Sequence, residues 1–129
     1  MIPKTIEWLN DRLRILDQTK LPQEQSFIDL TNYNDVVLAI KEMRVRGAPA
    51  IGIGAAYGIA LGAQGIKSEN KVEFFSQLDH ILQAFSTSRP TAVNLFRAID
   101  RMRKMAAMGD HIPEIKEALV NEARQIHRE

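Results

Sequence analysis

The sequence predicts an α+β fold that is mainly α: a small N-terminal antiparallel three-stranded sheet followed by a bundle of about five helices. Two patterns carry this prediction. Up to about residue 31, apolar residues alternate with polar ones, which is the period of a half-buried strand. After Asn34, apolar residues recur every three or four positions, which is the period of an amphipathic helix. We therefore expect one domain over 1–129, with a short β-meander at 4–31 and a helical bundle at 33–129.

Three short strands are expected at the start. The turn dipeptide Asn10-Asp11 separates the first two, and the segment DQTKLP at 17–22 separates the second from a third at 27–30. The alternating apolar residues of the first two strands are Ile6, Trp8, Leu13 and Ile15. A sheet this small must pack on something else to be stable.

Five helices are expected next. Apolar residues at helical spacing predict the first helix over about 33–45. Gly47 and Pro49 separate it from a second helix that runs to about Gly65. The segment SRPT at 88–91 separates the third helix from the fourth. The residues expected on the buried faces are Val36, Ile40 and Met43; then Val72, Phe75, Leu78, Leu82 and Phe85; then Ala92, Leu95, Ile99, Met102 and Ala106; and, after Gly109 and Pro113, Ile115, Leu119, Ala123 and Ile126.

Composition excludes several classes of protein. The 45% hydrophobic and 26% charged residues are those of an ordinary globular protein, and a net charge of +1 gives no global electrostatic case for nucleic acid or an anionic membrane. The chain has no cysteine, and its first ten residues lack the features of a secretory signal, so we expect a cytoplasmic location. The densest basic cluster, Arg97, Arg101, Arg103 and Lys104, is interpreted as a solvated helix face.

The uncharged stretch from Gly47 to Ile66 allows three interpretations. Glycines at 54, 58 and 62 have the spacing of a membrane helix that dimerises, but the many small residues give low hydrophobicity for a span. Glycines at 52, 54 and 58 miss the dinucleotide fingerprint by one residue and follow a helix where a strand is required. The interpretation we favour is a buried helix whose small residues let its neighbours approach closely.

The two predicted helix starts that follow an arginine are candidate anion sites. A first helical turn has unpaired N–H groups and the positive end of the helix dipole. Arg46 and Gly47 precede Pro49 at one start, and Arg89 precedes a proline at another. This arrangement predicts that both arginines face one phosphate or carboxylate.

The other titratable residues form no recognisable catalytic or metal site. His80, His111 and His127 lack metal-ligand spacing and are expected at the surface. Asp17 and Asp29 flank a loop and are interpreted as turn residues, and no general acid–base pair follows from their spacing.

Three segments resemble a known family, the 5-methylthioribose-1-phosphate isomerases, in their N-terminal domain. They are ILDQTKLP at 15–22, AIKEMRVRGAPAIGIGAAYGIALG at 39–62 and SRPTAVNL at 88–95. The isomerases are homologous to the regulatory subunits of translation initiation factor 2B and to archaeal ribose-1,5-bisphosphate isomerase. VRGAPAIG is shared across this superfamily, whereas DQTKLP together with SRPTAVNL points to the methylthioribose enzyme. The resemblance runs in order through essentially the whole chain.

The resemblance implies a cofactor-free aldose–ketose isomerisation of 5-methylthioribose 1-phosphate to 5-methylthioribulose 1-phosphate, in methionine salvage. In the family the RGA segment and the arginine of SRPT contact the substrate, which here are Arg46, Gly47, Ala48 and Arg89. It also implies a homodimer for the full-length protein. From the residues themselves we expect no metal ligand and no nucleic-acid or membrane partner.

The chain departs from the family pattern in one respect. The family's proposed catalytic cysteine and aspartate belong to a C-terminal Rossmann-like domain, and this sequence stops before that domain, within a helical pattern and without a helix cap. We therefore assign no catalytic residue here and expect these 129 residues alone to be inactive as an isomerase. Three alternatives stay open: a ribose-1,5-bisphosphate isomerase, a non-catalytic regulatory relative that binds a sugar phosphate or nucleotide, and a helical module whose glycine helix serves only packing.

Overall fold

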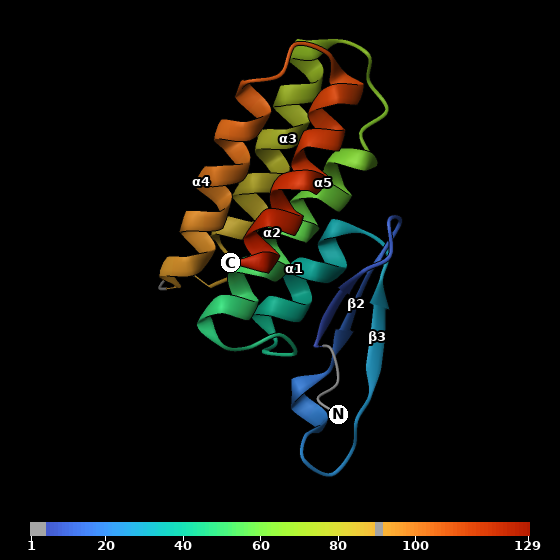
Figure 1. Ribbon diagram of the computed structural model, residues 1–129, viewed down its shortest axis with the longest axis vertical. Coiled ribbons are helices and arrows are strands. Elements are labelled where there is room, and N and C mark those ends of the chain that lie inside the picture. Colours follow the sequence, from blue (N-terminus) through green and yellow to red (C-terminus); the bar gives the residue numbers. More distant parts are fainter. Residues whose placement is uncertain (1–4, 90–91) are drawn as a thin grey trace.

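The computed structural model describes residues 5–89 and 92–129. Strands β1 (Ile6–Trp8), β2 (Leu13–Leu16) and β3 (Phe27–Leu30) form an antiparallel sheet in the order β1-β2-β3, beside a helical bundle (Figure 1). A short 3-10 turn, η1 (Gln18–Lys20), lies between β2 and β3. The helices are α1 (Tyr33–Lys41), α2 (Ala48–Gln64), α3 (Lys71–Ser86), α4 (Val93–Ala107) and α5 (Ile112–Arg128). The predicted fold class, α+β and mainly α, is confirmed.

The alternation of β2 places one face of the sheet against the bundle. Leu13 and Ile15 are fully buried, and they pair with Leu30 on β3 and Ile6 on β1. On the opposite face Arg14 lies across from Asp29 of β3, and its Nε donates to a carboxylate oxygen at 2.7 Å. The sheet is thus the predicted meander, with one apolar and one polar side.

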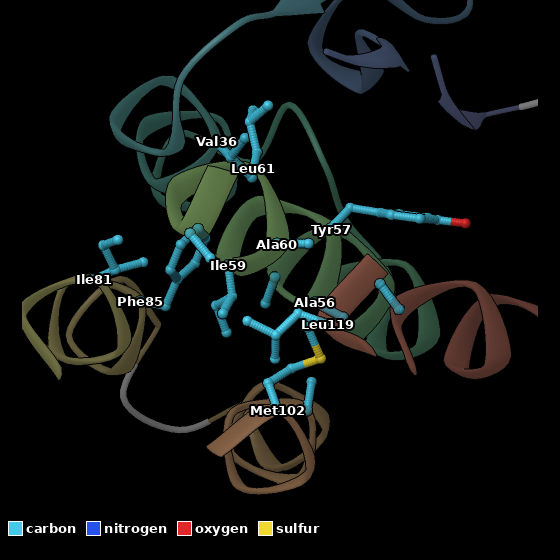
Figure 2. Packing of buried hydrophobic residues seen from close by; sticks show 14 of the residues in the cluster. Val36, Ala56, Tyr57, Ile59, Ala60, Leu61, Ile81, Phe85, Met102 and Leu119 are labelled. Atoms are coloured by element: carbon cyan, nitrogen blue, oxygen red, sulfur yellow. The ribbon is translucent and has the colours of Figure 1, made fainter. Parts of the chain in front are cut away.

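Helix α2 is the centre of the bundle. Figure 2 shows it surrounded by the other four helices, with Phe85 of α3, Met102 of α4 and Leu119 of α5 converging on it. Every residue from 51 to 63 except Ile53 is buried. The interpretation of the glycine-rich stretch as a close-packed core helix is therefore confirmed. Within the described residues, no helix is both long enough and apolar enough to cross a membrane.

Three local predictions were wrong. Met43, expected on the buried face of the first helix, is 43% exposed. Helix α1 ends at Lys41, not near residue 45, because Met43 adopts a left-handed backbone conformation with φ of 65°. The chain can then turn and bury Val45. On α3 the predicted face included Val72, which is 82% exposed, whereas the fully buried residue of that turn is Phe74.

Candidate functional site

Helix α2 begins with N–H groups for which the described residues provide no side-chain acceptor. Its N-cap is Gly47, whose φ of 96° is a conformation that side chains rarely adopt, and no side chain caps the helix. Pro49 lies in the first turn, where its missing N–H costs no hydrogen bond. The first turn contains no acidic residue. The N–H groups of this turn are available to an anion.

Helix α4 begins in the same way. Its N-cap, Ala92, has no side chain able to accept a hydrogen bond, and its first turn has no acidic residue. The Ala92 N–H donates to the carbonyl of Arg89 at 3.0 Å, so Arg89 lies one turn before the helix start. The last two residues of the SRPT motif, Pro90 and Thr91, lie outside the described residues.

The other three helices each carry an acid in the first turn. Asn32 caps α1 with Asp35 behind it, Asn70 caps α3 with Glu73 behind it, and α5 has Glu114. A carboxylate at this position offsets the positive end of the helix dipole. Only α2 and α4 leave that end uncompensated within the part of the chain that the structure describes.

The two bare helix starts are neighbours. Helices α2 and α4 both begin at the end of the bundle that is lowest in Figure 1. A Cβ added to Gly52, in the second turn of α2, would lie only 3.0 Å from the main-chain oxygen of Asn94 in the first turn of α4. The absence of a side chain at Gly52 thus allows the two N-terminal turns to meet, so that their positive ends reinforce each other.

Both predicted arginines flank these helix starts. Arg46 is exposed and makes no ion pair with any described residue. Arg89 is half-buried, and its Nη1 is completely buried without a hydrogen-bond acceptor among the described residues. A buried charged N–H without an acceptor is costly, so it is a strong indication of a missing partner. Ser88, the residue before Arg89, is itself held in place, because its Oγ donates to the carbonyl of Phe85 at 2.6 Å.

A pocket of about 250 Å³ adjoins the N-terminal turns of α2 and α4. Pro49, Gly52 and Ile53 line it from α2, and Asn94 and Arg97 from α4; Ala98, Arg101, Ile126 and Glu129 complete its wall. A larger pocket of about 410 Å³ lies at the other end of α2, near Leu61 and Ile66, and is lined by no lysine or arginine. A third pocket, of about 520 Å³, is lined by Lys67, Lys71 and Lys116 together with Glu69 and Asp110, and it lies away from both helix starts. The pocket of about 250 Å³ is distinguished by its place beside the N-terminal turns of α2 and α4.

The structure therefore brings the segments of all four predicted site residues, Arg46, Gly47, Ala48 and Arg89, to one end of the bundle. Asn94, which lines the adjoining pocket, was not among the predicted site residues. Its position in the SRPTAVNL motif, in the first turn of a helix that follows an arginine, was the available signal.

Asp17 is a second residue that sequence reasoning misjudged. It was interpreted as a turn residue, and it is one, since it caps η1, but its side chain is only 1% exposed and bonds to Arg44. Burial by itself raises the pKa of this carboxyl, but hydrogen bonds from Thr19 and the charges of Arg44 and Lys20 outweigh burial. The pKa of Asp17 consequently lies below its ordinary value of 3.8.

The remaining candidates are placed largely as expected. His80 and His111 are exposed, whereas His127, though exposed, shares a hydrogen bond of 2.7 Å between its Nδ1 and the Tyr57 hydroxyl. In the basic cluster of α4, Arg101 forms ion pairs with Glu122 of α5 and with Glu129, which follows α5. Lys104 pairs with Asp100, and Arg97 and Arg103 are exposed.

Comparison with known proteins identifies related chains. Methylthioribose-1-phosphate isomerase of Dehalococcoides mccartyi is 49% identical over 126 residues, which is 98% of this chain and 38% of that protein. The protein of the same name from Geobacter metallireducens is 44% identical over 128 residues, 98% of this chain and 37% of that one. This chain thus spans a little over a third of the length of these relatives.

Two solved structures share the fold. The crystal structure of 5-methylthioribose 1-phosphate isomerase from Pyrococcus horikoshii has a TM-score of 0.92 at 38% identity, over 97% of this chain and 36% of that one. That of translation initiation factor eIF-2B, subunit delta, from A. fulgidus has a TM-score of 0.88 at 38% identity, over 95% and 36%. The model of the initiation factor 2 subunit family matches residues 44–129, which include α2, α4 and both arginines. The chain belongs to the initiation factor 2 subunit family.

Proposed function

We propose that this chain is the N-terminal, phosphate-binding part of an aldose–ketose isomerase that converts 5-methylthioribose 1-phosphate to 5-methylthioribulose 1-phosphate. One observation carries the proposal: two uncapped, acid-free helix N-termini meet at Gly52 and Asn94, and Arg46 and Arg89 flank them. A phosphate dianion bound there would accept hydrogen bonds from main-chain N–H groups and from both guanidinium groups. The relatives named as isomerases support the choice of substrate.

Binding the phosphate addresses the main difficulty of this reaction. A phosphate on the anomeric carbon keeps the sugar ring from opening, so the enzyme must hold the phosphate while the ring oxygen is released. Fixed N–H dipoles and arginines are suited to this, because they stabilise negative charge without reorganising during the reaction. The proton transfers need an acid and a base, which the family resemblance places in the remaining part of the relatives. We therefore expect this chain to bind the phosphate without isomerising the sugar.

The proposal extends to the setting of the full-length enzyme. It would act in the cytoplasm, in methionine salvage, as a homodimer with a small sugar phosphate as its partner. These features follow the family resemblance.

A second candidate is a non-catalytic regulatory subunit that uses the same site for a sugar phosphate or a nucleotide. The specific observation in its favour is the TM-score of 0.88 to an eIF-2B subunit.

A third candidate is a ribose-1,5-bisphosphate isomerase. The exposed Arg97, which lines the adjoining pocket, would favour a substrate with a second phosphate, as in ribose 1,5-bisphosphate.

The test is a nuclear magnetic resonance titration of the ¹⁵N-labelled chain with 5-methylthioribose 1-phosphate, ribose 1,5-bisphosphate, AMP and inorganic phosphate. We expect the amide signals of Gly47, Ala48, Ala50 and Ile51 and of residues 93–96 to shift, most strongly with the methylthio sugar. Arg46→Ala and Arg89→Ala should each weaken binding roughly tenfold or more, the scale of a hydrogen bond to a charged group.

Arg103→Ala is the matched control, since it removes the same charge from an exposed position near the other end of α4. Equal affinity of the wild type and both site variants would refute the site. Tighter binding of the bisphosphate or of AMP would favour the corresponding alternative.

A further inference from the structure

An ion pair between the buried Asp17 and the half-buried Arg44, two residues before Arg46 in the chain, is not part of the proposed anion site. The Asp17 carboxylate is 1% exposed and accepts hydrogen bonds from the main-chain N–H of Thr19 at 2.9 Å and from its hydroxyl at 2.6 Å. Its second oxygen accepts from Nη1 of Arg44 at 2.7 Å. The carboxylate is thus held by three donors, one of which comes from a residue far along the chain.

The main chain makes a second link between the same two segments. The N–H of Gln18 donates to the carbonyl of Arg44 at 3.0 Å, so residues 17 and 18 bind both the side chain and the backbone of Arg44. Asp17 is itself anchored to the sheet, because its N–H donates to the carbonyl of Ser26 at 2.7 Å. The contact therefore joins the sheet to the connection between α1 and α2.

That connection carries Arg46. Only six residues, 42–47, join the end of α1 at Lys41 to the start of α2 at Ala48. Arg44 is held by residues 17 and 18, and the next residue, Val45, is buried in the core at 3% exposure. Arg46 then leads directly to Gly47, whose positive φ starts α2. The position of the Arg46 backbone follows from these fixed neighbours.

An ion pair with one buried partner is weak support for stability as such, because desolvation of the buried charge offsets much of the attraction. Its location is more informative. We propose that Asp17, acting through Arg44, is a positioning residue that holds Arg46 and Gly47 at the mouth of the anion site. This inference rests on the proposed function, since it assigns a role toward the same phosphate.

The experiment compares Asp17→Asn, Arg46→Ala and the double variant of the 129-residue chain in the phosphate titration described above. We expect Asp17→Asn to weaken phosphate binding roughly tenfold, by misplacing one charge-assisted contact. In the Arg46→Ala background the same change should have almost no further effect, because the group it positions is already gone. An equal loss in both backgrounds would mean a general structural effect and would overturn the inference.

Asp29→Asn is the matched control. It removes the same charge and breaks a carboxylate–arginine contact of the same length, 2.7 Å from Arg14, but on the outer face of the sheet. It should leave phosphate binding unchanged. If Asp17→Asn does not fold, Arg44→Gln tests the same link from its half-exposed side and should show the same dependence on Arg46.

The outcomes of the titration distinguish a failure of this inference from a failure of the proposed function. If Arg46→Ala and Arg89→Ala both bind phosphate like the wild type, the anion site itself is refuted. If only Asp17→Asn binds like the wild type, the positioning role alone is refuted. In the absence of any phosphate, the amide signals of residues 45–47 should shift and exchange faster in Asp17→Asn than in Asp29→Asn; unchanged signals would also overturn the role of Asp17.

Discussion

The glycines of α2 differ sharply in what surrounds them, and this makes their replacement by alanine a quantitative test of the packing. A Cβ added to Gly58 would overlap the ring of Phe85 and lie 2.8 Å from Cγ1 of Val36. Both neighbours are fully buried side chains that face α2, as Figure 2 shows. At Gly54 the nearest atom would be Cγ1 of Val45 at 3.6 Å, an ordinary van der Waals contact.

The two substitutions should therefore have opposite effects on the free energy of unfolding. Replacing glycine by alanine within a helix stabilises by roughly 0.5–1 kcal/mol, which is the whole expected effect at Gly54. At Gly58 the same gain is opposed by overpacking, which costs typically 1–3 kcal/mol in a rigid core. Gly58→Ala should be destabilised by about 1–2 kcal/mol, so the two variants should differ by about 2 kcal/mol.

Urea denaturation followed by circular dichroism at 222 nm measures this difference. For a chain of this size, about 2 kcal/mol corresponds to a separation of the unfolding midpoints of roughly 1 M urea. Because both variants add one methyl group to the same helix, helix propensity cancels from the comparison. If Gly58→Ala were as stable as Gly54→Ala, the side chains of Phe85 and Val36 could move aside at no cost in free energy. The description of α2 as a close-packed centre would then be wrong.

Three further changes test single features of the structure. Gly47→Ala should lower the free energy of unfolding by about 1 kcal/mol, because a residue with a Cβ is strained at a φ of 96°. No atom lies within 4 Å of the added Cβ, so backbone strain is the whole expected effect, and the urea midpoint measures it. Tyr57→Phe should cost about 0.5–1.5 kcal/mol in the same assay, since it removes the bond to His127 but keeps the stacking on Trp8. The stabilisation from Asp17, whose pKa is lowered on folding, is present above the ordinary value of 3.8 and lost as the pH falls through the lower folded value. Asp17→Asn should therefore reduce the drop in stability that the wild type shows below about pH 4.

The parts of the fold that were predictable depend on local chemistry. The hairpin at Asn10-Asp11 follows from alternation around a turn dipeptide, and the start of α2 follows from Gly47 and Pro49. The buried face of α3 was less predictable, since Phe74 and Phe75 are adjacent and the period alone allows either to face inward. The structure buries Phe74 fully and leaves Val72 in solvent, a choice that tertiary packing makes.

The errors near the candidate site have a common cause, which is contact between distant segments. Local pattern identified Asp17 as a turn residue, and its bond to the Thr19 N–H agrees with that. Its burial depends on Arg44, 27 positions away, which no local pattern reports. The early end of α1 has the same origin, because Met43 adopts its left-handed conformation where the chain must turn to bury Val45.

The meeting of the two arginine-flanked helix starts follows from topology combined with one small residue. In a series of helices joined by short connections, successive helices run in opposite directions, so α2 and α4 begin at the same end of the bundle (Figure 1). That argument brings Arg46 and Arg89 to one end but leaves open whether α3 separates them. Gly52 decides this, because its missing side chain lets α2 approach the backbone of Asn94 directly. The glycine-rich helix thus brings two positive helix ends together at Gly52 and serves packing along the rest of its length.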